Sequence, residues 1–488
     1  MALLCITIGA PTLAALRERR DVASRVADLV ELRLDTVSDP DVAGALAGRT
    51  GPVIVTCRPS WEGGHFEGSE EDRLGLLKQA WALGAEYVDL EFAALREAPW
   101  AAGARLILSA HDFSGVSSDL PNRYRAMLAT GAGVVKVAIT ARRLTDSLSL
   151  LSLKPPPNRR HIALAMGPAG LVTRIVPDLF GSAWTYAGED WAPGQIPASQ
   201  LQDEFRFGTV SARPALYGVV ARPSGHSVSP AMHNRAFAAA GIDAVYLPFE
   251  AESADDFLTF AGALGVRGAS VTIPFKVDLL HRVDADALAL KVGAVNTVRR
   301  DGQRWAGTNT DVEGLLAPLA GRIALPGARA AVLGSGGAAR AAALALSEAG
   351  AVVSIHGRSV AAARAVGDAV GVGSGPMPPQ PGTWDLLVNA TSAGMHPDVK
   401  TTPWTNPVFD GRLVYDLVYN PPVTRLLAEA RQAGCATLGG LEMLVAQAAA
   451  QFTYWTGRPA DPALMRTAAE ARLQAFAASA DTPTLSPS

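Results

Sequence analysis

The sequence has few cysteines, almost no net charge and no long apolar run. Its three cysteines, Cys5, Cys57 and Cys435, lie too far apart to have metal-ligand spacing. A sparse, odd set of cysteines argues against a disulfide framework and fits a reducing cytoplasm. The net charge of −3 gives no electrostatic signature for binding nucleic acid or an acidic membrane. No apolar stretch reaches the roughly 18 residues that would span a bilayer.

What is present is the composition of a large folded protein. The 488 residues are 49% hydrophobic and 18% charged, which excludes a disordered chain. At roughly 100–200 residues per domain, this length predicts two to four domains. The opening MALLCITIGAPTLAAL has no basic residue before its apolar run, so we interpret it as a first β-strand rather than a signal peptide.

Short apolar runs recur through the first 200 residues and alternate with helix-like segments. They predict eight strands, at 3–8, 29–34, 53–57, 87–92, 105–110, 134–139, 161–166 and 183–186. Eight strands that alternate with helices indicate a parallel sheet closed into a (β/α)8 barrel, whose chemistry lies at the C-terminal strand ends. Six of the eight predicted ends carry polar or reactive groups: Glu31 and Arg33, Arg58, Asp89 and Glu91, His111 and Asp112, Lys136, and Met166.

Lys136 stands inside the apolar strand VVKVAI, and His111 ends the strand before it. Apolar surroundings should lower the pKa of a lysine and free its amine to attack a carbonyl carbon. From position alone, an ion pair with Asp89 or Glu91 explains Lys136 equally well. Beside a nucleophilic lysine, His111 becomes a candidate proton shuttle near neutral pH.

Three cations in separate strand-end segments predict an anionic substrate, most simply a carboxylate: Arg33, Arg58 and Arg174. The segments VELRLD, TCRPSWEGG, YVDLEF, SAHDF, VVKVA, MGPAGLVTR and APGQI follow in the order of type I 3-dehydroquinate dehydratases, which this region resembles. The resemblance implies a Schiff base between Lys136 and the ketone of 3-dehydroquinate, with His111 moving the C2 proton and Glu62 supporting His111. It also implies substrate contacts from Glu31, Arg33, Arg58, Arg174 and Gln195. The chain departs from the family pattern at Leu164 and Trp191.

A second α/β pattern begins after a linker at 206–215 that contains glycine, serine and proline. It predicts strands at 217–220, 244–247, 269–273 and 295–299, and mostly helix from 441. Residues 328–359 predict a strand, a glycine turn of the pattern G-x-G-x-x-A, a helix and a strand. This context indicates a dinucleotide site at a helix N-terminus, with a plain glycine turn as the alternative. Arg358 stands where NAD enzymes usually have an acidic residue, which favours NADP.

Two further pairs of residues have both a functional and a structural interpretation. Ser227 and Ser229 lie in a loop, where they either contact a ligand or cap a helix before Pro230. Lys276 and Asp311 either transfer a proton beside a hydride acceptor or form a simple ion pair.

The segments SGHSVSP, GASVTIPFK, GAVNT, GTNTD, GSGGAAR, VNATSAGM, YDLVYNP and MLVAQAA resemble those of shikimate dehydrogenases in order, over about residues 215–475. The resemblance implies that Lys276 and Asp311 are the catalytic pair. The implied substrate contacts are Ser227, Ser229, Thr272, Asn296, Tyr419 and Gln447. The implied NADP contacts are Gly334, Gly336, Gly337, Ala338, Arg358 and Ser359, with Thr391 near the nicotinamide. Ser270 resembles the fused, plant-type enzymes, while Gly357 and the position of Arg364 depart from the common NADP-binding pattern.

The sequence therefore predicts an α/β protein with a TIM barrel at 1–208, followed by a two-lobed α/β dehydrogenase. Its substrate-binding domain covers 214–320, completed by helices within 441–475; its Rossmann NADP-binding domain covers 321–440, and 476–488 form a disordered tail. We expect a cytoplasmic, bifunctional shikimate-pathway enzyme, a monomer or homodimer, that binds no nucleic acid, membrane or metal. It would dehydrate 3-dehydroquinate to 3-dehydroshikimate and reduce that product to shikimate with NADPH. The alternatives are a catabolic quinate dehydrogenase fusion that uses NAD, and a fusion in which one half is a non-catalytic ligand-binding module.

Overall fold

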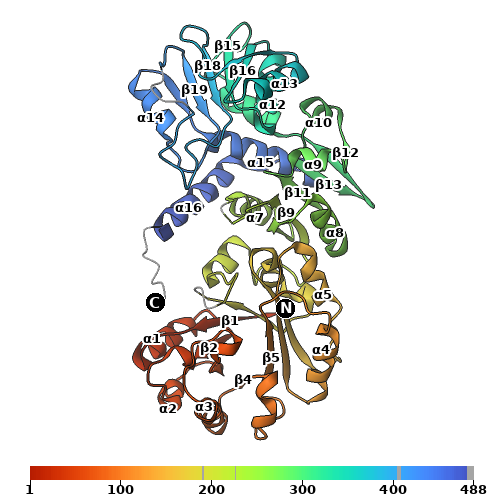
Figure 1. Cartoon of the computed structure of the whole chain (residues 1–488), viewed down its shortest axis with the longest axis vertical. Helices are drawn as coiled ribbons and strands as arrows, with labels where there is room; N and C mark the ends of the chain where they lie inside the picture. The colour runs from red at the N-terminus through yellow and green to blue at the C-terminus, as the bar shows by residue number, and fades with distance from the viewer. Residues whose placement is uncertain (189–191, 226, 404–407, 481–488) are drawn as a thin grey trace. The chain divides into compact units, whose positions relative to one another are not determined.

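The computed structural model describes residues 1–188, 192–225, 227–403 and 408–480 (Figure 1). Contacts divide the chain into two compact units. The first comprises residues 1–215, 222–225 and 243–265, and the second contains the rest of the described chain.

The first unit contains eight parallel strands in the order β7-β6-β5-β4-β3-β2-β1-β8. Their bounds are β1 (Leu3–Ile8), β2 (Leu29–Arg33), β3 (Val53–Thr56), β4 (Tyr87–Glu91), β5 (Leu106–Asp112), β6 (Val134–Thr140), β7 (Arg160–Met166) and β8 (Trp184–Ala187). A hydrogen bond from Ala183 N to the His161 carbonyl (2.8 Å) links the two ends of this order. The predicted eight-stranded barrel is therefore confirmed as a nearly closed one.

Helices cover the outside of the barrel, which explains why its strands are apolar on both faces. These helices are α1 (Leu13–Ala23), α2 (Val42–Leu46), α3 (Glu70–Ala82), α4 (Leu120–Ala129), α5 (Leu148–Leu151) and α6 (Val172–Ile175). Helix α3 begins where the side chain of Ser69 accepts a hydrogen bond from Asp72 N at 3.1 Å, and its first turn is acidic, as the helix dipole favours. The barrel interior is filled by side chains from its strands, including Ile54, Ile107, Ile162 and Trp184.

A segment from later in the sequence completes the first unit. Strand β10 (Ala244–Glu250) and helix α8 (Ala254–Leu264) belong to it. The carboxylate of Asp256 in α8 accepts hydrogen bonds from Leu144 N (3.0 Å), Thr145 N (2.9 Å) and Thr145 Oγ1 (2.8 Å). These two residues begin η4 (Leu144–Ser147), the turn that follows β6, so Asp256 caps that turn.

The second unit begins with a sheet in which β9, β11, β13, β14 and β12 follow one another. Its elements are β9 (Ala215–Ala221), α7 (Ser229–Ala239), β11 (Gly268–Val271), α9 (Lys276–Leu280), β12 (Asp284–Ala285), α10 (Ala287–Val292), β13 (Thr297–Asp301), β14 (Arg304–Thr308) and α11 (Asp311–Leu316). Strands β12 and β14 were not predicted, because both are short and β14 is interrupted by Gly307. Strand β14 pairs with β13 as an antiparallel hairpin.

The rest of the second unit has a parallel sheet of order β17-β16-β15-β18-β19-β20, the doubly wound order of a Rossmann fold. Figure 1 labels four of these strands, β15, β16, β18 and β19. Its elements are β15 (Arg329–Leu333), α12 (Gly337–Glu348), β16 (Val352–Gly357), α13 (Val360–Val370), β17 (Gly373–Pro376), β18 (Leu386–Asn389), β19 (Leu413–Asp416), α14 (Arg425–Gln432) and β20 (Ala436–Leu438). The strand order reverses between β15 and β18, where such folds bind their ligands.

Two long helices end the described chain, α15 (Gly440–Thr456) and α16 (Pro462–Ala480). Helix α16 extends to Ala480, so the start of the predicted tail at 476 was placed too early; the remainder of that tail, 481–488, lies outside the described residues. None of the described helices is both long enough and apolar enough to cross a bilayer. All three cysteines are buried free thiols.

Candidate active sites

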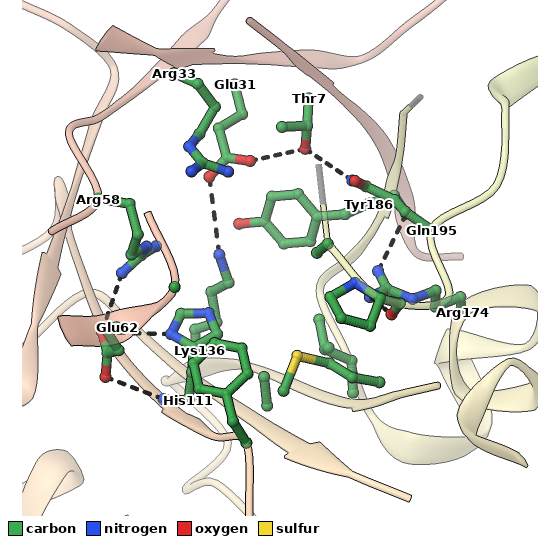
Figure 2. A pocket seen from close by; sticks show the side chains of 17 residues that line it. Thr7, Glu31, Arg33, Arg58, Glu62, His111, Lys136, Arg174, Tyr186 and Gln195 are labelled. Atoms are coloured by element: carbon green, nitrogen blue, oxygen red, sulfur yellow. Dashed lines mark hydrogen bonds and ion pairs between the residues drawn. The ribbon is translucent and has the colours of Figure 1, made fainter. Parts of the chain in front are cut away.

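A pocket lies at the C-terminal ends of the barrel strands, where the ends of parallel strands meet (Figure 2). All eight residues that the sequence assigned to this site line it: Glu31, Arg33, Arg58, Glu62, His111, Lys136, Arg174 and Gln195. They come from segments spread over more than 160 positions of the chain, and the barrel brings them together.

Lys136 occupies the inner face of β6 among charged groups. Its Nζ lies 3.2 Å from Asp89 Oδ2 and 3.8 Å from Glu31 Oε1. The centroid of the Tyr186 ring is 4.3 Å from Nζ. The expectation of apolar surroundings is therefore wrong, because β2 and β4 present carboxylates to the same layer of the barrel. The ion pair that was the alternative explanation is present, and it lies inside the pocket.

His111, at the end of β5, is held by Glu62. One carboxylate oxygen of Glu62 accepts a hydrogen bond from His111 N at 3.1 Å, and the other lies 3.4 Å from His111 Nδ1. Burial, reinforced by the cations Arg58 and Lys136, holds the pKa of His111 well below its ordinary value of 6.5. The imidazole is therefore neutral near pH 7 and able to accept a proton.

Arg58 binds the buried carboxylates behind the lysine. Its guanidinium donates to Asp89 at 2.9 Å and to Glu91 at 2.7 Å, and Arg73 of α3 donates to the other oxygen of Glu91 at 2.6 Å. Burial opposes ionisation of Asp89, but Arg58 and Lys136 hold its pKa well below the ordinary value. The site thus keeps a fixed negative charge beside Lys136.

Arg174, in α6, lacks such compensation. Its side chain is buried at 2% exposure, and its nearest acceptors are the carbonyl oxygens of Tyr186 (3.5 Å) and Pro193 (3.4 Å). Among the described residues, Arg174 Nε and the neighbouring Gln195 Oε1 have no hydrogen-bond partner. Burial lowers the pKa of Arg174 to about 10. A buried, unpaired guanidinium beside a pocket is suited to bind a carboxylate from solution.

Two pocket residues with polar side chains were missed in the sequence, Thr7 on β1 and Tyr186 on β8. Thr7 Oγ1 donates to Glu31 at 2.7 Å and accepts from Gln195 Nε2 at 3.1 Å, so it orients both side chains. The strand-end rule could have found them, since β1 and β8 supply the two ends to which the sequence assigned no polar or reactive group. Leu164 also lines the pocket, whereas Trp191 lies outside the described residues.

The second unit brings Lys276 and Asp311 together at the starts of α9 and α11. Lys276 Nζ donates to Asp311 Oδ2 at 2.5 Å, and Asn296 Nδ2 donates to Asp311 Oδ1 at 2.7 Å. Thr310 N in turn donates to Asn296 Oδ1 at 2.7 Å. The carboxylate is therefore fixed on one oxygen by an amide and on the other by the ammonium.

The glycine turn after β15 lies next to Lys276 on one side and next to Ala390 and Thr391 on the other. Gly334 has a φ of +119°, and a Cβ there would stand 3.0 Å from Ala390 O and 3.3 Å from Thr391 Cγ2. A Cβ on Gly337, the first residue of α12, would stand 3.5 Å from Lys276 Cδ. A Cβ on Gly336 would meet no atom within 4 Å. The turn thus leaves open space at a helix N-terminus, as a pyrophosphate requires.

Two residues that follow β16 have different roles: Arg358 is a cation free to bind an anion, and Ser359 is the N-cap of α13. Arg358 is exposed and forms no ion pair within the described chain, so it can bind an anion. Ser359 accepts a hydrogen bond from Ala362 N at 3.2 Å and caps α13. Ala338 continues the first turn of α12, and Arg364 is exposed on α13.

The predicted substrate contacts of the second unit lie at the start of α7, next to the ends of strands, and on α15. Ser227 Oγ accepts from Ser229 N at 3.2 Å, but the N-cap residue of α7 is Val228 and no side chain caps this helix, so the structure does not show the predicted cap. Gln447 Nε2 donates to Leu444 O at 2.8 Å, Thr272 follows β11, and burial raises the pKa of Tyr419. Gln451 was missed.

Gln451 links α15 to the sheet of the second unit. Its Oε1 accepts from Ser270 Oγ at 2.6 Å, and its Nε2 donates to Asn296 O at 3.3 Å. Across the described chain, no three His, Cys, Asp or Glu side chains are grouped as a metal site needs.

Three family models match the chain: type I 3-dehydroquinase over residues 4–210, the shikimate dehydrogenase substrate binding domain over 219–298, and the shikimate 5'-dehydrogenase C-terminal domain over 440–470. The bifunctional 3-dehydroquinate dehydratase/shikimate dehydrogenase, chloroplastic, of Arabidopsis thaliana is 33% identical over 480 residues, which cover 89% of this chain and 78% of the plant protein. The chain belongs to the bifunctional 3-dehydroquinate dehydratase/shikimate dehydrogenase family.

Relatives of the second unit alone agree with this family. The NADP(+) shikimate dehydrogenase of Halobacterium salinarum is 44% identical over 265 residues, which cover 53% of this chain and 99% of that protein. A shikimate dehydrogenase solved in complex with NADP+ superposes with a TM-score of 0.51 at 31% identity, covering 54% of this chain and 97% of that one. As a member of the bifunctional family, the protein is a lyase and an oxidoreductase of the shikimate pathway.

Proposed function

We propose that the barrel dehydrates 3-dehydroquinate through a Schiff base on Lys136 and that the second unit reduces the product, 3-dehydroshikimate, to shikimate with NADPH. The observation that carries the first step is the pairing of Lys136 with a neutral His111 in a pocket that also holds the uncompensated Arg174. Arg174 binds the substrate carboxylate, and Gln195, Glu31, Arg33 and Arg58 contact the ring and its hydroxyls.

The chemistry of the barrel follows from these positions. The Lys136 amine adds to the ketone, and loss of water gives an iminium, which acidifies the neighbouring C2–H because it withdraws electrons. His111 accepts the C2 proton and returns it to the hydroxyl that leaves from C1 as water. Glu62 supports His111 by accepting a hydrogen bond from its backbone N and by placing a carboxylate oxygen 3.4 Å from Nδ1. Hydrolysis of the product iminium restores the amine.

In the second unit, the cofactor supplies a hydride when it is bound. The turn of Gly334, Gly336, Gly337 and Ala338 receives its pyrophosphate, Arg358 and Ser359 its adenosine side, and Thr391 its nicotinamide side. Lys276 donates a proton to the oxygen that becomes a hydroxyl, and Asp311 holds the ammonium. Ser227, Ser229, Thr272, Asn296, Tyr419 and Gln447 bind the substrate.

A coupled assay tests both activities at once: 3-dehydroquinate and NADPH are supplied, and shikimate is measured as the product. A conversion that stops at 3-dehydroshikimate would leave the second unit as a non-catalytic module. Comparing shikimate with quinate as the substrate oxidised, and NADP with NAD as the cofactor, separates this proposal from a catabolic quinate dehydrogenase. Arg358 favours NADP. We also propose the domain division given by the sequence, a cytoplasmic location, small-molecule partners alone and a monomer or homodimer.

Replacing Arg174 with methionine is expected to weaken substrate binding and to stabilise the free protein. Loss of a bidentate, charge-assisted contact should raise KM for 3-dehydroquinate about 100-fold. Because Arg174 is a buried cation without an anionic partner among the described residues, its removal should also raise the free energy of unfolding, by about 1 kcal/mol. Steady-state kinetics and thermal unfolding measure the two effects. An unchanged KM would remove Arg174 from the binding site.

The depressed pKa of His111 makes a prediction about the pH dependence of dehydration. The neutral imidazole is the active base, and it persists below pH 6.5 because its folded-state pKa is lowered. As pH falls, kcat/KM should therefore stay level through pH 6.5 and decline only at a lower pH. The profile is measured from the absorbance of the conjugated product over about pH 5–8. A half-maximal loss at or above pH 6.5 would contradict a base of this kind.

A further inference from the structure

One buried carboxylate ties together two strand ends of the Rossmann sheet. Asp416 ends β19 at 0% exposure, and its Oδ1 accepts hydrogen bonds from Asn389 Nδ2 (2.8 Å) and Val418 N (3.1 Å). Its Oδ2 accepts from Thr424 Oγ1 at 2.5 Å. These donors are neutral, and no ion pair within the described residues involves Asp416. The carboxylate is therefore held by hydrogen bonds to β18, to its own loop and to the start of α14.

Asn389 passes this restraint to Thr391. It ends β18 directly opposite Asp416 in the register of the two strands. Its Oδ1 accepts from Thr391 N at 3.0 Å and from Thr391 Oγ1 at 2.7 Å. Because its Nδ2 is used by Asp416, the amide of Asn389 has one orientation, and that orientation fixes Thr391 beside Gly334 of the glycine turn.

The same carboxylate restrains the loop that carries Tyr419. The bond from Val418 N to Asp416 Oδ1 shapes the turn directly before Tyr419. Two backbone bonds continue the restraint, from Leu417 N to Asn389 O (3.0 Å) and from Gly440 N to Val418 O (3.2 Å). The start of the β18–β19 connection and the β19–α14 loop are therefore tied to each other, with Asp416 as their shared acceptor.

We propose that Asp416 is a positioning residue of the dehydrogenase, which sets Thr391 and Tyr419 relative to the glycine turn without touching cofactor or substrate itself. This inference rests on the roles proposed above for Thr391 and Tyr419. Its physical basis is that hydride transfer requires the two reactants within a few tenths of an ångström of the productive geometry.

The ionisation of Asp416 gives the proposal a readout beyond loss of activity. Burial raises its pKa to about 6 against the three donors, which favour the charged form. Above pH 6 the carboxylate accepts all three bonds. As pH falls through 6 it gains a proton, one acceptor position becomes a donor, and the restraint on the two loops weakens. The apparent KM for NADP+ should therefore rise as pH falls through about 6.

The test compares Asp416→Asn, Thr424→Val and the matched control Thr424→Ser in the full chain. At pH 7.5, Asp416→Asn should raise KM for NADP+ about tenfold, with a smaller change in kcat, and should remove the inflection near pH 6. Thr424→Val deletes one donor to the charged form, so the inflection should move to higher pH. Thr424→Ser keeps that donor and should leave the inflection at its wild-type pH. Dehydration of 3-dehydroquinate should be unchanged in all three variants.

Two results would overturn the proposal: a folded Asp416→Asn with the wild-type KM and inflection, or a Thr424→Val whose inflection does not move. If Asp416→Asn does not fold, the pH of the inflection in Thr424→Val decides whether the proposal stands. Failure of the underlying function is distinguishable. If Thr391→Ala and Tyr419→Phe leave both KM for NADP+ and KM for shikimate unchanged, the roles proposed for those two residues are wrong. If they raise the KM values while the Asp416 and Thr424 variants do not, only the positioning role fails.

Discussion

Lys136→Ala is expected to abolish the dehydration of 3-dehydroquinate while shikimate oxidation by the same chain continues at the wild-type rate. The variant removes the only atom of this pocket that the proposed chemistry uses as a nucleophile, so the iminium that acidifies C2 cannot form. Removing a covalent nucleophile costs about 10⁵-fold or more in kcat. The rate is followed by the appearance of the conjugated product, and shikimate oxidation by the absorbance of NADPH.

Reductive trapping identifies the intermediate itself. Borohydride added with 3-dehydroquinate should reduce the iminium to a stable amine, and peptide mass spectrometry should find the adduct on Lys136. Lys154→Ala is the matched control, because Lys154 is an exposed lysine of the same unit outside the pocket. It should keep both activity and adduct. Absence of an adduct from the wild-type protein, or full activity in Lys136→Ala, would remove the Schiff base from the mechanism.

Lys276→Met should produce the complementary loss, with shikimate oxidation falling about 10³–10⁴-fold and dehydration unaffected. The Lys276 amine, 2.5 Å from Asp311, donates the proton to the oxygen in reduction and takes it up from the hydroxyl in oxidation, and a methionine of similar length can do neither. Asp311→Asn should cause a smaller loss, since it leaves the ammonium in place but releases it from its partner. Both losses should appear mainly in kcat.

Cofactor binding separates a chemical role of Lys276 from a structural one. NADPH affinity, measured by fluorescence titration, should change less than threefold in Lys276→Met, about 0.6 kcal/mol. Lys291→Met is the control, because Lys291 is an exposed lysine on α10 that pairs with Glu348 at the surface. It should leave both reactions intact. Retention of a tenth or more of the oxidation rate in Lys276→Met would exclude it as the proton donor.

The residues that meet in the barrel pocket were largely predictable, because a parallel barrel gathers strand ends at one mouth. Charged side chains in apolar strands, such as Glu31 and Lys136, mark those ends clearly. Thr7 and Tyr186 carry no charge and give a weaker signal, although they line the same pocket from β1 and β8. The order of the motifs then supplied roles that spacing alone leaves open, such as that of Glu62.

What the sequence could not provide is the pairing of charges in space. Arg33 and Arg174 look equivalent along the chain, yet Arg33 is bound by Asp35 at 2.6 and 2.9 Å whereas Arg174 has no anionic partner in the described chain. Likewise, the expectation of apolar surroundings for Lys136 failed because its own strand is apolar, while β2 and β4, which do not pair with it, place Glu31 and Asp89 beside its ammonium. Asp416 lies within the motif YDLVYNP, but its function emerges only when β18 is placed beside β19.

The discontinuous make-up of the first compact unit limits how the gene can be divided. The type I dehydroquinase match ends at residue 210, and that is where sequence alignment would separate the two enzymes. The peptide 243–265 lies beyond that point and carries Asp256, the acceptor for Leu144 N and Thr145 N after the lysine strand. Splitting the gene there would give a dehydratase without the cap of its own loop. In this protein, the segment that matches the dehydroquinase family and the compact unit that contains it therefore end at different residues.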